Sequence, residues 1–316
     1  MDASRIVKEI LAKTPGGIQE INYIGCGGSR ASVFAGHYLM KHEAKAIASN
    51  WFNSNEFVHA APRSLGPGSV CVVCSLKATP ESLEALRLAN SRGAATIALT
   101  GSPDTGLAKE AQYPLVYTTR ADGNQAHALR VGFELLHQQE AWRHYAEAQT
   151  ALEKVDSLIA SALERSLPAA REFGLLYKDD QLFHILASGS AYSAAYIMAF
   201  CHLMEMQWKH AVPIHSGEYF HGPFEATDKD LPMILIKSTG RTRPLDERVE
   251  RFLAQYASRV TIIDTVELGL PSMGEHVAEY FNSVLMLTVA HQYVDELSKQ
   301  TGHPMQHRRY MWQFDY

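Results

Sequence analysis

Short apolar runs alternate with longer segments of helical spacing along this chain. Six such runs read as strands, at residues 21–24, 70–74, 95–99, 183–187, 233–236 and 259–263. Continuous apolar strands separated by helices are typical of a parallel sheet that is covered on both faces. The pattern therefore predicts an α/β fold with doubly wound parallel sheets.

The polar turns between these elements recur at nearly one spacing. Residues 28–32 match residues 189–193, residues 54–57 match 216–219, and residues 75–79 match 238–242, at offsets of 161 to 163 residues. The strand at residues 95–99 pairs in the same way with residues 259–263. An internal repeat of this length predicts two tandem copies of one doubly wound, flavodoxin-like domain.

The boundary between the copies is expected in a helical linker. Residues 146–173 are rich in Ala, Leu and Glu at helical spacing, with an expected break at Pro168. We therefore predict a first domain at residues 1–150, a second at residues 151–294, and a basic and aromatic tail at residues 295–316.

Composition narrows the class of protein and its surroundings. Lys and Arg number 29 against 34 Asp and Glu, and no long basic run is present, so nucleic acid and anionic membranes are disfavoured as partners. We read no signal peptide and no membrane span, and four cysteines point to a reducing compartment, the cytoplasm. Cys71 and Cys74 have CxxC spacing but lie inside an apolar run, which favours a buried strand over a redox or zinc motif.

Hydroxyl side chains gather where phosphate-binding turns are expected. In a parallel sheet, ligands bind beyond the carboxyl ends of the strands. Ser29 lies at one such turn, and Ser75, Lys77 and Thr79 lie at the next. These residues are candidates for binding a phosphate dianion, and the alternative is that the hydroxyls only cap helices. Arg30 stands where a dinucleotide fingerprint needs Gly, so no nicotinamide cofactor is expected.

A single acid lies in the apolar segment 192–208. Glu205 is flanked there by methionines and Trp208, and apolar surroundings suit a carboxylate that acts as a base near neutral pH. His221 follows sixteen residues later, before a Gly-Pro turn that leaves its imidazole at a loop edge. The alternatives are a structural ion pair for Glu205 and a solvated His221. The histidines show no known ligand spacing, so no metal is expected.

These motifs together resemble the sugar isomerase (SIS) family. The chain is most similar to its deglycases of fructosamine 6-phosphates in residues 203–208 (LMEMQW), 214–225 (IHSGEYFHGPFE) and 308–312 (RRYMW). The resemblance implies Glu205 as the base and His221 of a neighbouring subunit as the ring-opening acid/base, in a homodimer with shared active sites. It implies no cofactor or metal, and it assigns the phosphate to Ser29, Ser75 and Thr79. The turn 75–79 departs from the family pattern, because it is one residue shorter and has Ala78 near the expected Gly.

The resemblance implies a sugar-phosphate substrate, an Amadori compound whose amino acid is released along with glucose 6-phosphate. A plain aldose-ketose isomerase of phosphosugars would use the same residues, and a non-catalytic sugar-phosphate sensor would need the hydroxyls but not Glu205. Arg308 and Arg309 lie among aromatic residues in the tail. Either the tail folds over the site, so that the arginines contact the amino acid part of the substrate, or it packs on a partner subunit.

Overall fold

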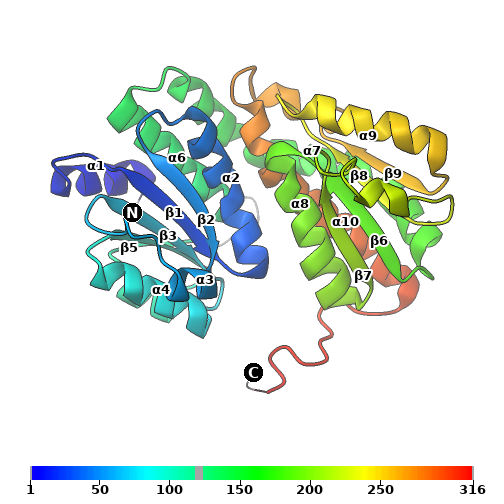
Figure 1. Ribbon diagram of the computed structural model, residues 1–316, viewed down its shortest axis with the longest axis horizontal. Helices are drawn as coiled ribbons and strands as arrows, with labels where there is room; N and C mark the ends of the chain where they lie inside the picture. The colour runs from blue at the N-terminus through cyan, green and yellow to red at the C-terminus, as the bar shows by residue number, and fades with distance from the viewer. Residues whose placement is uncertain (1, 118–123, 315–316) are drawn as a thin grey trace. The chain divides into compact units, whose positions relative to one another are not determined.

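The chain divides into two compact units. The computed structural model describes residues 2–117 and 124–314, and the units are Met1–Asp156 and Ser157–Tyr316 (Figure 1). Each contains one parallel sheet with helices on both faces. The predicted architecture of two tandem doubly wound domains is therefore confirmed.

The sheet of the first unit has the strand order β2-β1-β3-β4-β5, with all strands parallel. Its strands are β1 (Glu20–Gly25), β2 (Ala48–Asn53), β3 (Ser69–Cys74), β4 (Ala95–Thr100) and β5 (Tyr113–Val116). Helices α1 (Ala3–Lys13), α2 (Gly27–Glu43) and α6 (Asn124–Glu140) pack together on one face, and α3 (Ser54–His59), α4 (Pro80–Ser91) and α5 (Gly106–Glu110) on the other. β1 and β3 are buried along their whole length because they lie between both helical layers.

The sheet of the second unit has the order β7-β6-β8-β9, also parallel. Its strands are β6 (Leu182–Ala187), β7 (His210–His215), β8 (Met233–Lys237) and β9 (Val260–Asp264). Helix α9 (Arg243–Tyr256) covers one face, and α8 (Tyr192–Ile197), the π-helix Met198–Glu205 and α10 (Asn282–Thr301) pack on the other. Four short 3₁₀ helices lie between these elements in the described part of the unit: Gly189–Ala191, Pro223–Ala226, Leu270–Met273 and Ala278–Phe281.

The first turn of each unit confirms the repeat and corrects its register. Gly27 and Gly189 each lie two residues after the first strand, with φ of 52° and 53°. Glycine adopts this left-handed conformation without the steric cost that a side chain brings. The structure thus matches Gly27 with Gly189, one residue from the match between Gly28 and Gly189 that the sequence suggested.

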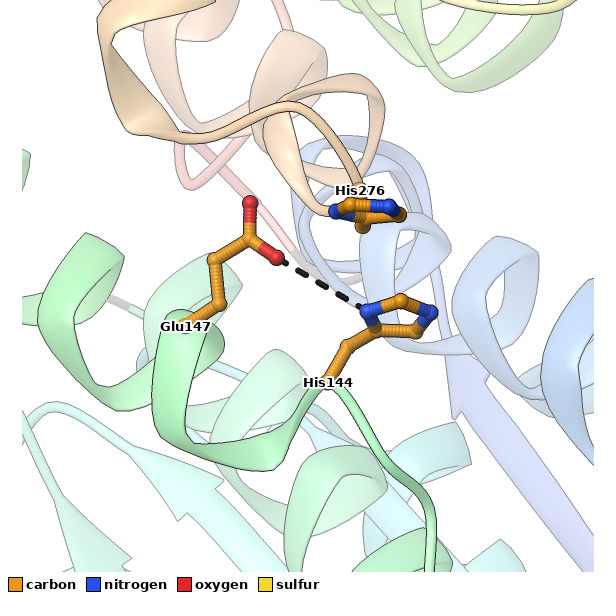
Figure 2. Close-up of side chains that lie close together, drawn as sticks. All are labelled: His144, Glu147 and His276. Carbon is orange, nitrogen blue, oxygen red and sulfur yellow. Dashed lines mark ion pairs between the residues drawn. The ribbon is translucent and has the colours of Figure 1, made fainter.

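The helix that joins the units, α7 (Tyr145–Tyr177), is continuous, so the predicted break at Pro168 is wrong. A proline inside a helix costs about 3 kcal/mol. Phe173 and Tyr177 are buried one and two turns beyond it, where Phe173 contacts Phe183, and burying each such side chain contributes about 1.5–3 kcal/mol. At the other end of α7, His144 Nδ1 lies 3.7 Å from Glu147 Oε2 in the first turn (Figure 2).

Cys71 and Cys74 are fully buried in β3, as the apolar run around them predicted, and neither forms a disulfide. In the parts of the chain that the structure describes, every helix is either too short or too polar to cross a bilayer.

Candidate phosphate turn and candidate base

The candidate phosphate turn lies at the switch point of the first sheet. β1 and β3 are neighbours, and the chain leaves them toward opposite faces of the sheet. Ser29 follows β1 in the first turn of α2, and Ser75 follows β3 before α4. A Cβ on Gly25 would approach the carbonyl oxygen of Cys74 to 3.2 Å, so the ends of the two strands lie close together. Ligands of doubly wound sheets bind in this crevice.

Backbone amides of this turn point to an anion site. Ser75 Oγ accepts a hydrogen bond from the amide of Thr79 (3.1 Å), whereas the amides of Leu76 and Ala78 donate to no acceptor among the described residues. Ala78 has φ of 55°, the left-handed conformation that favours glycine, which explains why the family has Gly near this position. Lys77 and Thr79 are exposed. Turns that present successive free amides form anion-binding concavities.

In the corresponding turn of the second unit, residues 238–242, side chains of the protein already occupy backbone amides. Three of its amides donate to side-chain oxygens: Ser238 to Asp246 (2.8 Å), Thr239 to Asn282 (2.9 Å) and Arg241 to Glu279 (2.9 Å). Two of these acceptors are carboxylates. An incoming phosphate would find these three donors taken and would meet like charge.

One buried position, Ser82 in the first unit and Asp246 in the second, accounts for much of this difference between the units. In the first unit, Ser54 Oγ lies 3.1 Å from Ser82 Oγ, so the two side chains beneath the turn are neutral hydroxyls. In the second unit, the matched Ser216 donates instead to the fully buried Asp246 (2.6 Å), which also accepts from Ser238 Oγ (2.6 Å). We therefore assign the candidate phosphate turn to the first unit alone.

The candidate base ends an irregular helix of the second unit. Residues Met198–Glu205 form a π-helix, a conformation that is rare and often occurs at functional sites. Three residues later, Trp208 has φ of 56°, and the amide of Lys209 donates back to the carbonyl of Leu203 (3.0 Å). Unfavourable backbone of this kind costs on the order of 1–3 kcal/mol per residue and clusters at active sites. The local geometry thus makes the surroundings of Glu205 a candidate functional region.

Glu205 lines a cavity of about 600 Å³ within the second unit. The other lining residues are Phe200, Met204, Trp208, Lys209, His210, Arg308, Arg309, Tyr310 and Met311. The volume is within the range of about 300–1,000 Å³ that is usual for ligand pockets. Lys209 does not project a free charge here, because its Nζ donates to the carbonyls of Lys178 and Asp180, and burial lowers the pKa of this lysine.

The tail brings two arginines to this cavity, in different environments. Arg308 forms an ion pair with Glu205 (2.7 Å), so the carboxylate has the structural partner that the sequence left open. The guanidinium of Arg309 stacks 4.1 Å from the ring centre of Trp208, and Arg309 is exposed with no carboxylate partner in the described parts of the chain.

His221 lies on the surface of the second unit and is not among the residues that line the cavity around Glu205. It follows two buried or half-buried aromatic residues, Tyr219 and Phe220, which pack on Phe252. Gly222, with φ of 131°, then turns the chain. The segment is therefore fixed by its aromatic neighbours while the imidazole itself is exposed.

Sequence reasoning missed Phe200 and Met204, which line the cavity and are 42% and 40% exposed. Their spacing of four residues on an apolar segment could have indicated an exposed apolar strip one turn before Glu205. It also missed Asp246, although Asp246 and Ser82 occupy matched places in the two repeats.

The SIS domain profile matches residues 18–128 and 175–292. The chain belongs to the SIS domain family. It is 34% identical to the fructosamine deglycase FrlB of Bacillus subtilis (strain 168), over 100% of this chain and 97% of that protein. It is 24% identical to the fructoselysine 6-phosphate deglycase of Escherichia coli (strain K12), over 84% of this chain and 77% of that protein.

Solved structures agree with this assignment. A candidate phosphosugar isomerase from Salmonella typhimurium LT2 matches with a TM-score of 0.96 and 37% identity, over 100% of this chain and 98% of that one. A candidate phosphosugar isomerase from Bacillus subtilis matches with a TM-score of 0.92 and 33% identity, over 99% of both chains.

Proposed function

We propose that this chain is a phosphosugar-processing enzyme, and specifically a deglycase that releases an amino acid from a fructosamine 6-phosphate. The observation that carries the proposal is a carboxylate, Glu205, held at the wall of a cavity lined largely by apolar side chains. The open phosphate turn at residues 75–79 and the deglycases among the relatives support it.

In the proposed reaction the turn 75–79 binds the 6-phosphate and His221 of a partner subunit assists opening of the sugar ring. Glu205 then takes a proton from C1, the C–H electrons form the C1–C2 double bond, and O2 gains a proton to give an enaminol. Protonation at C2 moves the double bond to C1–N as an imine. Water adds at C1, the C1–N bond breaks, and the products are glucose 6-phosphate and the free amino acid. The steps consume one water and need no redox partner.

The cavity favours a conjugate over a bare phosphosugar. Its apolar residues and the guanidinium of Arg309 provide contacts for groups that fructose 6-phosphate lacks, an amino acid side chain and its carboxylate. Guanidinium groups bind carboxylates with charge-assisted hydrogen bonds. We therefore assign the amino acid part of the substrate to Arg309 and its neighbours in the tail.

The proposal is tested by incubating the purified chain with a panel of 6-phosphorylated Amadori compounds and measuring both glucose 6-phosphate and free amino acid. Release of both in equal amounts is expected. Conversion of fructose 6-phosphate to an aldose phosphate without any amino acid release from the panel would make the chain an isomerase. Tight binding of phosphosugars without either reaction would make it a sensor.

Replacing Ser75 or Thr79 by alanine is expected to weaken binding of glucose 6-phosphate about 10-fold or more, because each change removes a hydrogen bond to a charged group worth about 1.5–3 kcal/mol. Calorimetric titration measures the change. Ser238→Ala, the matched change in the turn 238–242, serves as the control and should leave phosphosugar affinity near that of the unaltered protein. Equal losses for Ser75→Ala and Ser238→Ala would refute the assignment of the phosphate to the first unit.

Arg309→Gln is expected to raise KM about 10-fold for conjugates of α-amino acids and to change kcat little, because it removes one charge-assisted contact to a carboxylate. Steady-state kinetics measures both constants. The matched control is a fructosamine 6-phosphate made from a simple alkylamine, which has no carboxylate, and its KM should be the same for both proteins. A similar rise in KM for both substrates would mean that Arg309 does not bind the carboxylate.

A further inference from the structure

The guanidinium of Arg308 is directed entirely toward the protein itself. Its Nε donates to Oε1 of Glu205 (2.9 Å), its Nη2 forms an ion pair with the same oxygen (2.7 Å), and its Nη1 donates to the carbonyls of Met305 (2.7 Å) and His307 (3.0 Å). The side chain is only 7% exposed. Each of its three nitrogens thus has an acceptor, which leaves Arg308 poorly suited to the substrate contact that the sequence suggested for it.

The two carboxylate oxygens of Glu205 consequently differ in their contacts with the protein. Oε1 accepts the hydrogen bond from Nε of Arg308 and forms the ion pair with Nη2, whereas Oε2 accepts no hydrogen bond from any residue that the structure describes. The side chain is 21% exposed and lines the cavity. A general base acts through an oxygen with a free lone pair, held within hydrogen-bond reach of the proton. Fixing Oε1 fixes the carboxylate plane and leaves Oε2 as the free oxygen.

The backbone around Glu205 explains why such a partner is needed. The π-helix ends at this residue, and Trp208 in the left-handed conformation turns the chain away three residues later. Only Met206 and Gln207 remain helical beyond the carboxylate. The guanidinium of Arg308, 103 positions along the chain, restricts the carboxylate by its contact with Oε1.

The tail is anchored beside Glu205 independently of Arg308. The buried Gln207 donates to the carbonyl of His303 (2.9 Å) and accepts from Thr301 Oγ1 (3.1 Å). The ring of Trp208 contacts the rings of His303 and His307, with centres 4.3 and 5.0 Å apart. Removing the Arg308 side chain should therefore leave the start of the tail in place.

We propose that Arg308 is a positioning residue of the reaction, which holds Oε1 of Glu205 so that Oε2 takes the proton from C1. This inference rests on the proposed function only in that Glu205 is the base. It differs from a simple structural role in one respect: the effect of Arg308 on turnover passes through Glu205.

A double-mutant cycle tests this role. Arg308→Gln is expected to lower kcat about 10- to 100-fold with KM within about 3-fold of its starting value, since the base is displaced but the substrate contacts remain. Arg308→Lys should recover part of the loss, because an ammonium can still reach Oε1. In the Glu205→Gln background, adding Arg308→Gln should change the residual rate by less than about 2-fold.

The outcomes separate this inference from the proposed function. A loss from Arg308→Gln that persists at full size in the Glu205→Gln background, or that appears only in KM, would overturn the positioning role, and so would an unchanged kcat. Thermal melting of each variant controls for unfolding. Exchange of the C1 proton of fructose 6-phosphate with D₂O gives the cycle a second readout. Exchange without amino acid release would overturn the deglycase proposal alone, and absence of both reactions in the unaltered chain would overturn both.

Discussion

Replacing Glu205 by glutamine is expected to lower the turnover number of deglycation by about 10²-fold or more while the substrate still binds. The amide oxygen of glutamine can occupy the place of Oε1 and accept the hydrogen bond from Nε of Arg308. The amide nitrogen then replaces Oε2, and it donates hydrogen bonds but takes up no proton. The variant therefore preserves the geometry of this contact and removes the base. Steady-state kinetics gives kcat, and calorimetric titration gives the affinity for the product.

Glu225→Gln is the matched control for this experiment. Glu225 is an exposed carboxylate of the same unit, in the 3₁₀ helix after His221. Its replacement by glutamine removes the same charge as Glu205→Gln does, at a residue that does not line the cavity. Turnover of this variant should be close to that of the unaltered chain. If Glu205→Gln also kept near-normal turnover, Glu205 would be no more than the structural partner of Arg308.

Mixing Glu205→Gln chains with His221→Asn chains, each inactive alone, is expected to restore activity to roughly a quarter of normal. The expectation follows from the proposal that one active site takes Glu205 from one subunit and His221 from its partner. In a two-fold symmetric mixed dimer, one site then collects both changes and the other collects none. Random exchange makes about half of the dimers mixed, each with one intact site out of two.

The assay needs proof that subunits exchange, which native mass spectrometry of chains with different tags provides. If both residues of a site came from one chain, every site in the mixture would carry one change and no activity would return. A mixture that exchanges completely and stays inactive would therefore refute the shared site. The exposed position of His221, outside the cavity that holds Glu205, is compatible with a role at a partner's site.

The central strands were predictable because burial on both faces leaves an uninterrupted apolar run. β1 and β3 are of this kind. The edge strand β2 has no buried residue and contains polar ones, and β7, an edge of the other sheet, carries histidines at both ends. Such edge strands form because the neighbouring strand offers backbone hydrogen bonds, and the amino-acid composition of the edge strand does not reveal that neighbour. The sequence patterns accordingly missed both.

The site was predictable where the chemistry depends on local sequence and not where it depends on distant contacts. Glu205 was evident as one acid in an apolar segment, and Ala78 as a departure from the glycine of the family turn. The pairing with Arg308 joins segments 103 residues apart, so no local pattern contains it. The π-helix packs against α10 and β7, and the segment's own sequence does not contain these contacts.

The π-helix before Glu205 also sets this enzyme's response to selection for stability. Removing one residue between Met198 and Leu203 would allow the segment to rewind as an α-helix of 3.6 residues per turn, which changes the side-chain directions within the rewound turns. The shortened helix would have better hydrogen-bond geometry, and Glu205 at its end would lose the position in which Arg308 now contacts it. Libraries of variants selected only for heat resistance should therefore accumulate such deletions. The selected variants would have a higher melting temperature and a lower kcat than the unaltered chain. Engineering of this fold is safer when the length of residues 198–205 is kept fixed.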